Sequence, residues 1–220
     1  MVPKAMSKIG VGRVDVNTLN INELMTSSAV AVRSRLIDGL ERCVSSKGLA
    51  ATTISDVVAA AQVSKRTFYE HFSDKDACFL ASYLTCTERV LTAITEAVDT
   101  AAPWRQQVRS MMRAYLAQLQ AKPALTQTFF LEIQAAGPKT LQARQGVYQR
   151  FNDVIRDQVR RMRKYNPHLG TLPPAMATAV VGGINALVLL AVESGRTDRL
   201  ESLEVTATDL LCAVLERRKG

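Results

Sequence analysis

The chain has 220 residues, of which 47% are hydrophobic, 22% charged and 5% aromatic, with only 7 prolines and 11 glycines. This composition excludes global disorder and favours an all-α protein with a substantial core. The net charge of +8 suits a polyanionic partner, but residues 1–80 carry 10 Lys and Arg against 8 Asp and Glu, so a nucleic-acid function needs a motif to support it.

Three short helices are predicted in the N-terminal third. Residues 1–28 are polar without a period and are interpreted as a flexible arm. Beyond Val30, apolar residues at every fourth position predict an amphipathic helix that ends at Gly48. Thr53, with Asp56 three positions later, is the expected N-cap of a second helix. Ser64 is the expected N-cap of a third, which ends near residue 72.

Six longer helices are predicted to follow. Their expected ranges are 74–99, 104–120, 123–136, 138–165, 175–192 and 200–218, separated by proline, glycine and polar breaks. No alternating strand pattern competes with them. We therefore expect three domains or segments: an arm (1–28), a helix-turn-helix domain (29–76) and a ligand-binding and dimerisation domain (77–220).

The segment 175–192 is uncharged over eighteen positions, which is long enough for a bilayer-spanning helix. It also contains Thr178, Asn185 and the pair Gly182–Gly183, and no other segment is membrane-like. A helix buried on all sides has the same composition. We favour that interpretation and expect no membrane association.

The stretch SKRTFYEHF, residues 64–72, predicts a two-faced helix. Phe68 and Phe72 lie four positions apart and share a face that can pack on the first two helices. The other side offers hydrogen-bond donors suited to phosphates and base edges. With the neighbouring helix starts, the candidate DNA-binding residues are Thr53, Ser64, Lys65, Arg66, Thr67, Tyr69, His71 and Lys75.

The run TTISDVVAAAQVSKRTFYEHFSDKDACFLASY resembles the DNA-binding domain of TetR-family transcriptional regulators, in detail over about residues 33–83. The resemblance implies a homodimer on a palindromic double-stranded DNA operator, with recognition helices about 34–36 Å apart. The family commonly has glycine where this chain has Gln62. If that position needs a positive φ, glutamine costs about 1 kcal/mol.

The resemblance also implies that the C-terminal helices bind a small-molecule effector and form the dimer. A concentration of methionine and aromatic residues predicts an adaptable apolar cavity. Its candidate ligand-binding residues are Trp104, Met111, Met112, Tyr115, Phe129, Phe130, Tyr148 and Phe151. Small residues and a leucine stripe predict the dimer interface at Gly182, Gly183, Ala186, Leu203, Leu210 and Val214.

The function predicted is a cytoplasmic, ligand-responsive DNA-binding regulator, most simply a repressor released by an apolar or amphipathic molecule. An enzyme is not expected, because the histidines are isolated and no nucleophile motif, phosphate loop or metal spacing occurs. The four cysteines likewise lack metal spacing, and no cofactor is expected. The alternative is a helical small-molecule-binding protein without DNA-binding function.

Overall fold

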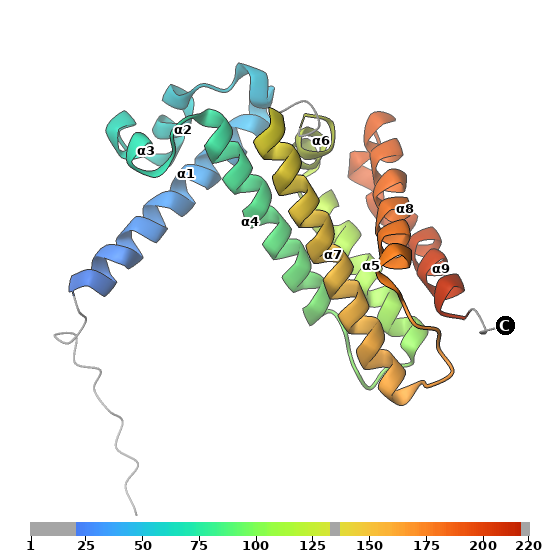
Figure 1. Cartoon of the computed structure of the whole chain (residues 1–220). Helices are drawn as coiled ribbons and strands as arrows, with labels where there is room; N and C mark the ends of the chain where they lie inside the picture. Colours follow the sequence, from blue (N-terminus) through green and yellow to red (C-terminus); the bar gives the residue numbers. More distant parts are fainter. Residues whose placement is uncertain (1–20, 133–136, 217–220) are drawn as a thin grey trace, which may run out of the picture.

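The computed structural model describes residues 21–132 and 137–216, and every regular element in these ranges is helical. The helices are α1 (Ile21–Ala51), α2 (Ile54–Ala61), α3 (Lys65–His71), α4 (Lys75–Glu96), α5 (Trp104–Gln120), α6 (Pro123–Leu131), α7 (Gly137–Tyr165), α8 (Pro174–Glu193), the 3₁₀ helix η2 (Thr197–Leu203) and α9 (Glu204–Leu215). The expected all-α fold is confirmed, with α1–α3 at one end of a larger C-terminal bundle (Figure 1).

Helix α1 begins at Ile21, nine residues earlier than its apolar stripe indicated. The expected arm is therefore wrong for residues 21–28, because a helix can extend beyond the part of its sequence that packs on a core. The rest of the arm, residues 1–20, lies outside the described residues. At the other end, Gly48 has φ 78° and ψ 164° and interrupts the helical geometry, as its expected role as a stop requires.

The N-terminal domain is built on a close crossing of α1 and α2. Leu36, Leu40 and Val57 are buried there, and Gly39 lies at the crossing point. A Cβ on Gly39 would lie 2.9 Å from the carbonyl oxygen of Val57. Only glycine permits this backbone approach, which brings α2, and with it the turn into α3, close to α1.

The turn between α2 and α3 passes through Gln62 in the left-handed region, at φ 55° and ψ 48°. Its N–H donates to the carbonyl of Ala59 at 3.2 Å, and that of Val63 donates to Val58 at 3.0 Å. The turn thus needs the positive φ that glycine adopts without strain. The helix-turn-helix geometry is kept, with a local strain at Gln62.

Replacing Gln62 with glycine is expected to stabilise the protein by roughly 0.5–1 kcal/mol, because the relief of left-handed strain exceeds the entropy that glycine loses. Thermal unfolding followed by circular dichroism measures the effect. Gln149→Gly, at an exposed site inside α7, is the control and should destabilise by about 1 kcal/mol. A loss of stability in Gln62→Gly would contradict the strain.

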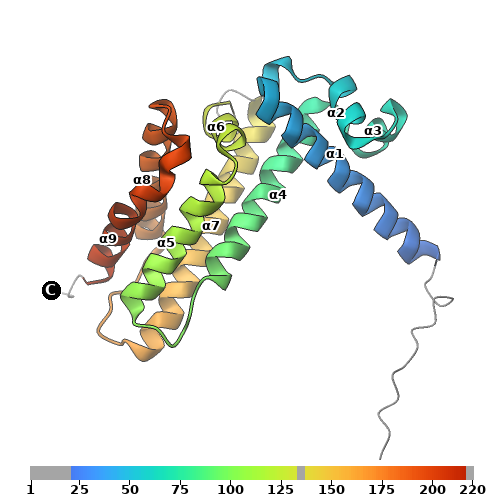
Figure 2. The ribbon, with the colours of Figure 1, turned by 180° about the vertical axis from the view of Figure 1, so that it is seen from behind.

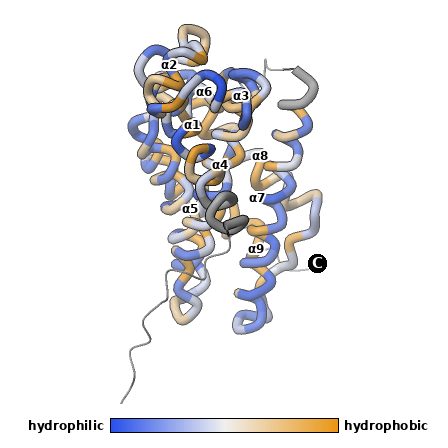
Figure 3. Tube along the Cα trace, turned by 90° about the vertical axis from the view of Figure 1, so that its left-hand side faces the viewer, coloured by the Kyte–Doolittle hydropathy of each residue, from blue (hydrophilic) through white to orange (hydrophobic). Residues whose placement is uncertain are grey.

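The C-terminal bundle places α4, α5 and α7 side by side, with α8, η2 and α9 packed on α5 and α7 (Figures 1 and 2). Its core includes Val108, Met111, Ile155, Val159 and Leu211, contributed by three different helices. Hydrophobic and hydrophilic residues alternate along most of the helices (Figure 3), as amphipathic helices around a shared core require.

Helices α4 and α6 connect this bundle to the N-terminal domain. Cys78 and Phe79 of α4, and Leu125 and Phe129 of α6, pack in the same cluster as Leu36 and Phe68. The N-terminal core therefore includes residues beyond 76. The division at residues 76 and 77 stays a prediction.

Within the described ranges, α8 is the one helix long and apolar enough to cross a membrane. We expected α8 to be buried on all sides, and this expectation is wrong. Val180, Ile184 and Val188 are buried against the bundle, whereas Ala179, Ala186 and Leu190 are exposed. One uncharged face of α8 is thus left open in the single chain.

Candidate DNA-binding surface and effector cavity

Helix α3 is a short helix with a well-formed start. The Ser64 hydroxyl accepts the backbone N–H of Thr67 at 3.0 Å, which satisfies one of the free donors of the first turn. The Thr67 hydroxyl lies 2.9 Å from the same oxygen. Ser64 therefore acts as the expected N-cap, and both hydroxyls lie at the end of α3 that the helix-turn-helix motif presents to the major groove.

The two faces of α3 divide as the sequence predicted. Phe68 is fully buried and Phe72 is 5% exposed, and their ring centroids lie 5.8 Å apart. Tyr69 is 57% exposed, although its ring meets the edge of Phe68. The buried pair holds the helix in place while Tyr69 faces outward.

The basic side chains of α3 are open to solvent. Lys65 and Arg66 are both exposed, and the side chain of Arg66 is 90% accessible. Arg66 makes one ion pair, 3.2 Å from Glu70 on the next turn, which is worth little in water and can exchange for a phosphate or base. Thr67 and His71 are half-buried at the margins of this face.

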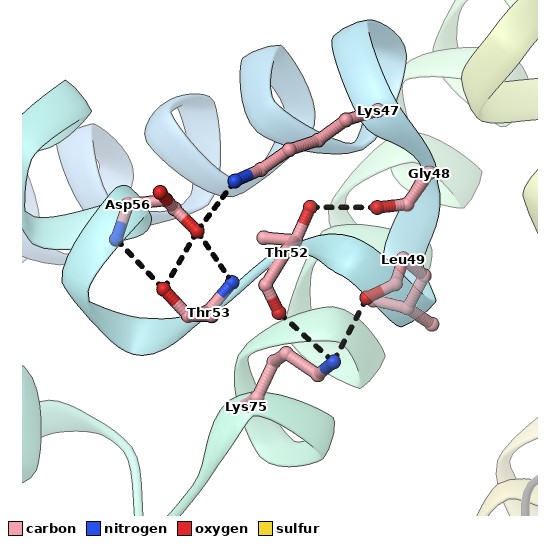
Figure 4. A network of polar contacts seen from close by, with 7 residues as sticks. All are labelled: Lys47, Gly48, Leu49, Thr52, Thr53, Asp56 and Lys75. Atoms are coloured by element: carbon pink, nitrogen blue, oxygen red, sulfur yellow. Dashed lines mark hydrogen bonds and ion pairs between the residues drawn. The ribbon is translucent and has the colours of Figure 1, made fainter.

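A capping box holds the start of α2 (Figure 4). Thr53 donates its backbone N–H to Asp56 at 2.7 Å and accepts the N–H of Asp56 at 3.2 Å. Lys47 of α1 lies 2.7 Å from the same carboxylate. Its hydrogen bond and those from Thr53 hold the pKa of Asp56 well below its usual range. Thr53 is therefore an exposed cap whose hydroxyl already has a partner.

The side chain of Lys75 faces inward (Figure 4), so the phosphate contact expected at this helix start stays a prediction for its backbone N–H. Its ammonium donates to the carbonyls of Leu49 and Thr52, at 2.8 Å and 3.0 Å. These carbonyls lie beyond the regular part of α1, after the interruption at Gly48. Lys75 thus fastens α4 to the loop between α1 and α2, and only one of its three donors is left.

Seven of the eight expected ligand-binding residues lie around one cavity of about 120 Å³ in the C-terminal bundle. They are Met111, Met112, Tyr115, Phe129, Phe130, Tyr148 and Phe151. Trp104 is not among the lining residues. It is at the first position of α5, about two turns from Met111, and its ring is covered by the Arg105 guanidinium.

The cavity also has polar lining residues that the sequence did not single out, notably Lys122 and Arg144. The Arg144 guanidinium lies 5.6 Å from the centroid of the Tyr148 ring. Burial raises the pKa of Tyr83 to about 12, with Tyr148 adding to the shift and Arg144 opposing it. These residues occupy separate segments of the chain, so no local pattern could have identified them together.

The two expected interface glycines have different surroundings. A Cβ on Gly182 would meet nothing within 4 Å, and Ala186, one turn later, is exposed. Gly183 instead packs inside the chain, where a Cβ would lie 3.2 Å from Leu210 of α9. Leu203 and Val214 are half-buried. Gly182 and Ala186 belong to the open face of α8, and Gly183 sets the approach of α9.

Comparison with known proteins gives a family for the N-terminal domain. Residues 36–82 match the family model described as bacterial regulatory proteins, tetR family. The match spans the last part of α1, all of α2 and α3 and the start of α4. No curated protein matches the chain significantly.

Solved structures resemble the whole fold. The fatty acid degradation regulator FadR from Bacillus halodurans has a TM-score of 0.71 at 16% identity, over 85% of this chain and 97% of its own. FadR from Bacillus subtilis, in complex with stearoyl-CoA, has 0.69 at 14%, over 83% and 98%. PfmR from Thermus thermophilus, a TetR-family regulator, has 0.60 at 20%, over 83% and 100%. At these identities the likeness shows the fold.

Proposed function

We propose that this chain, whose residues 36–82 are a TetR-family DNA-binding domain, is a homodimeric repressor that a small molecule releases from a palindromic operator. One observation carries the proposal: α3 is held by buried Phe68 and Phe72 while Lys65, Arg66 and Tyr69 are exposed together. That face matches the chemistry of the DNA major groove. The same exposure argues against the alternative of a binding protein without DNA function.

The open face of α8 supports the homodimer. Ala179, Gly182, Ala186 and Leu190 recur at intervals of three or four residues and carry no charge. Small residues allow a second copy of the helix to approach closely. Helices α8 and α9 lie on the side of the molecule away from α2 and α3 (Figure 1), so a dimer formed there leaves both α3 helices free for DNA.

The cavity supports control by a small molecule. It is lined by residues from α4, α5, α6, α7 and α8, and α4 and α6 also pack against the N-terminal core. A molecule that displaces either helix therefore changes the angle of the DNA-binding domain. We expect the bound state to change the spacing of the two α3 helices, so that they no longer match the operator.

Arg66→Ala is expected to weaken binding to the specific operator about 5- to 150-fold, the range of a lost contact to a base edge. Selection of genomic DNA by the purified full-length protein supplies the operator, and fluorescence anisotropy at fixed salt measures the affinity. The control is Arg160→Ala, an exposed arginine of α7 paired with Asp157 on its own helix. It should change affinity less than twofold. Failure to select any genomic fragment would overturn the proposed function.

A further inference from the structure

The cavity has two chemically different ends. Ile94, Met111, Met112 and Ile155 line one end, and they belong to the apolar core of the bundle. Tyr83 and Cys86 precede Ile94 by two to three turns of α4, which places them roughly 12–16 Å closer to the N-terminal domain. Arg144 acts electrostatically on Tyr83, and Lys122 acts on Cys86, so the two basic residues of the lining belong to this second end, which we call the polar end.

The polar end is defined by Lys122 and Arg144. Among the described residues, no carboxylate forms an ion pair with Arg144, whose half-buried guanidinium lies over the Tyr148 ring. A half-buried guanidinium without an anion beside an apolar cavity is a site for the charged head of an amphipathic acid.

Lys122 already has an anionic partner, and that partner belongs to the N-terminal domain. Its ammonium lies 2.5 Å from Glu41 of α1, whose side chain is only 7% exposed. Ser82 donates to the other carboxylate oxygen at 3.0 Å, and Arg89 lies 3.7 Å away. A carboxylate buried to this extent depends on its partners, and Lys122 makes the shorter of its two ion pairs.

We propose that the effector is a small apolar acid whose anion binds between Arg144 and Lys122 and takes Lys122 from Glu41. The inference rests on the proposed function and names the ligand class of the same cavity. In the present conformation, the 120 Å³ cavity holds about four waters at about 30 Å³ each, which is less than the volume of octanoate. A straight-chain acid near octanoate therefore opens the cavity slightly as it binds, and a stearoyl chain requires a larger opening.

Competition for one ammonium supplies the coupling between ligand and DNA. When the acid binds Lys122, the Glu41 carboxylate loses its closest cation. The contact between α1, which carries Glu41, and the start of α6, which follows Lys122, is then weaker. The two anions also repel each other across a short distance. By linkage, the DNA-bound conformation, in which Glu41 holds Lys122, must bind the acid less tightly by the same factor.

The ligand class is tested by calorimetry with straight-chain acids from hexanoate to dodecanoate and with the matching alcohols. We expect the best acid to bind at least tenfold more tightly than its alcohol. Arg144→Met should reduce that preference to about twofold and leave alcohol binding unchanged. If no acid binds, or if the alcohol binds as tightly as the acid, the inference is overturned.

The coupling is tested with Glu41→Gln, which keeps the shape of the side chain and removes the competing charge. We expect this variant to bind operator DNA and octanoate, but octanoate should release it from DNA at least tenfold less effectively. Asp38→Asn is the matched control, because Asp38 lies on the same helix, 3.8 Å from the same Arg89, and is half-exposed. It should respond to octanoate like the unaltered protein.

The two proposals fail in different ways. If the unaltered protein selects no DNA, the proposed function is overturned. If it binds DNA and Glu41→Gln is released by octanoate as readily as Asp38→Asn, only the competition is overturned. Lys122→Met provides a second test: it should lose the preference for acid over alcohol, whereas a purely structural role for Lys122 would leave that preference intact.

Discussion

Replacing Phe68 with alanine is expected to lower the free energy of unfolding by about 3–5 kcal/mol, the usual cost of removing a buried aromatic ring. Phe68 is fully buried where α1, α2 and α3 meet, and its ring touches that of Phe72. Because α4 and α6 pack in the same cluster, the cavity left behind also affects the C-terminal bundle. Denaturant unfolding followed by circular dichroism measures the loss.

The neighbouring residue provides the control. Tyr69 is 57% exposed on the outward face of α3, so Tyr69→Ala should cost less than about 1 kcal/mol. Under the proposed function, the same variant weakens DNA binding although the protein remains folded. Equal losses of stability at the two positions would show that α3 does not divide into an anchoring and a presenting face.

Under the proposed function, replacing Ala186 with glutamate is expected to convert the proposed homodimer into monomers and to lower operator affinity on the order of 100-fold. In a two-fold interface each substitution occurs twice, so two carboxylates would be buried without partners on the open face of α8. The loss of affinity follows because two separate half-sites no longer share one high effective concentration. Sedimentation velocity and fluorescence anisotropy measure the two effects.

Ala101→Glu is the matched control, since Ala101 is exposed in the loop between α4 and α5. It should leave both the oligomeric state and the operator affinity unchanged. A monomeric state of the unaltered protein at micromolar concentration would contradict the expected interface. A dimer that persists in Ala186→Glu would place the interface elsewhere.

The sequence was most informative where the physical cause is local. The caps at Thr53 and Ser64, the stop at Gly48 and the outward face of α3 depend on residues one or two turns apart. The positive φ at Gln62 was raised only by the resemblance, because the TetR family commonly has glycine at this position. The start of α1 was misplaced because a helix need not carry an apolar stripe along its whole length.

By itself, then, the sequence determined the helical class, the helix-turn-helix domain and the residues that α3 presents, because periodicity, caps and turns act within a few residues along the chain. The tertiary structure alone decided which distant groups meet. It pairs Glu41 with Lys122 across 81 positions, uses Lys75 inside the domain, places Trp104 away from the cavity and packs Gly183 on Leu210. Such contacts depend on how whole helices stack, and the chemistry proposed for the effector arises from them.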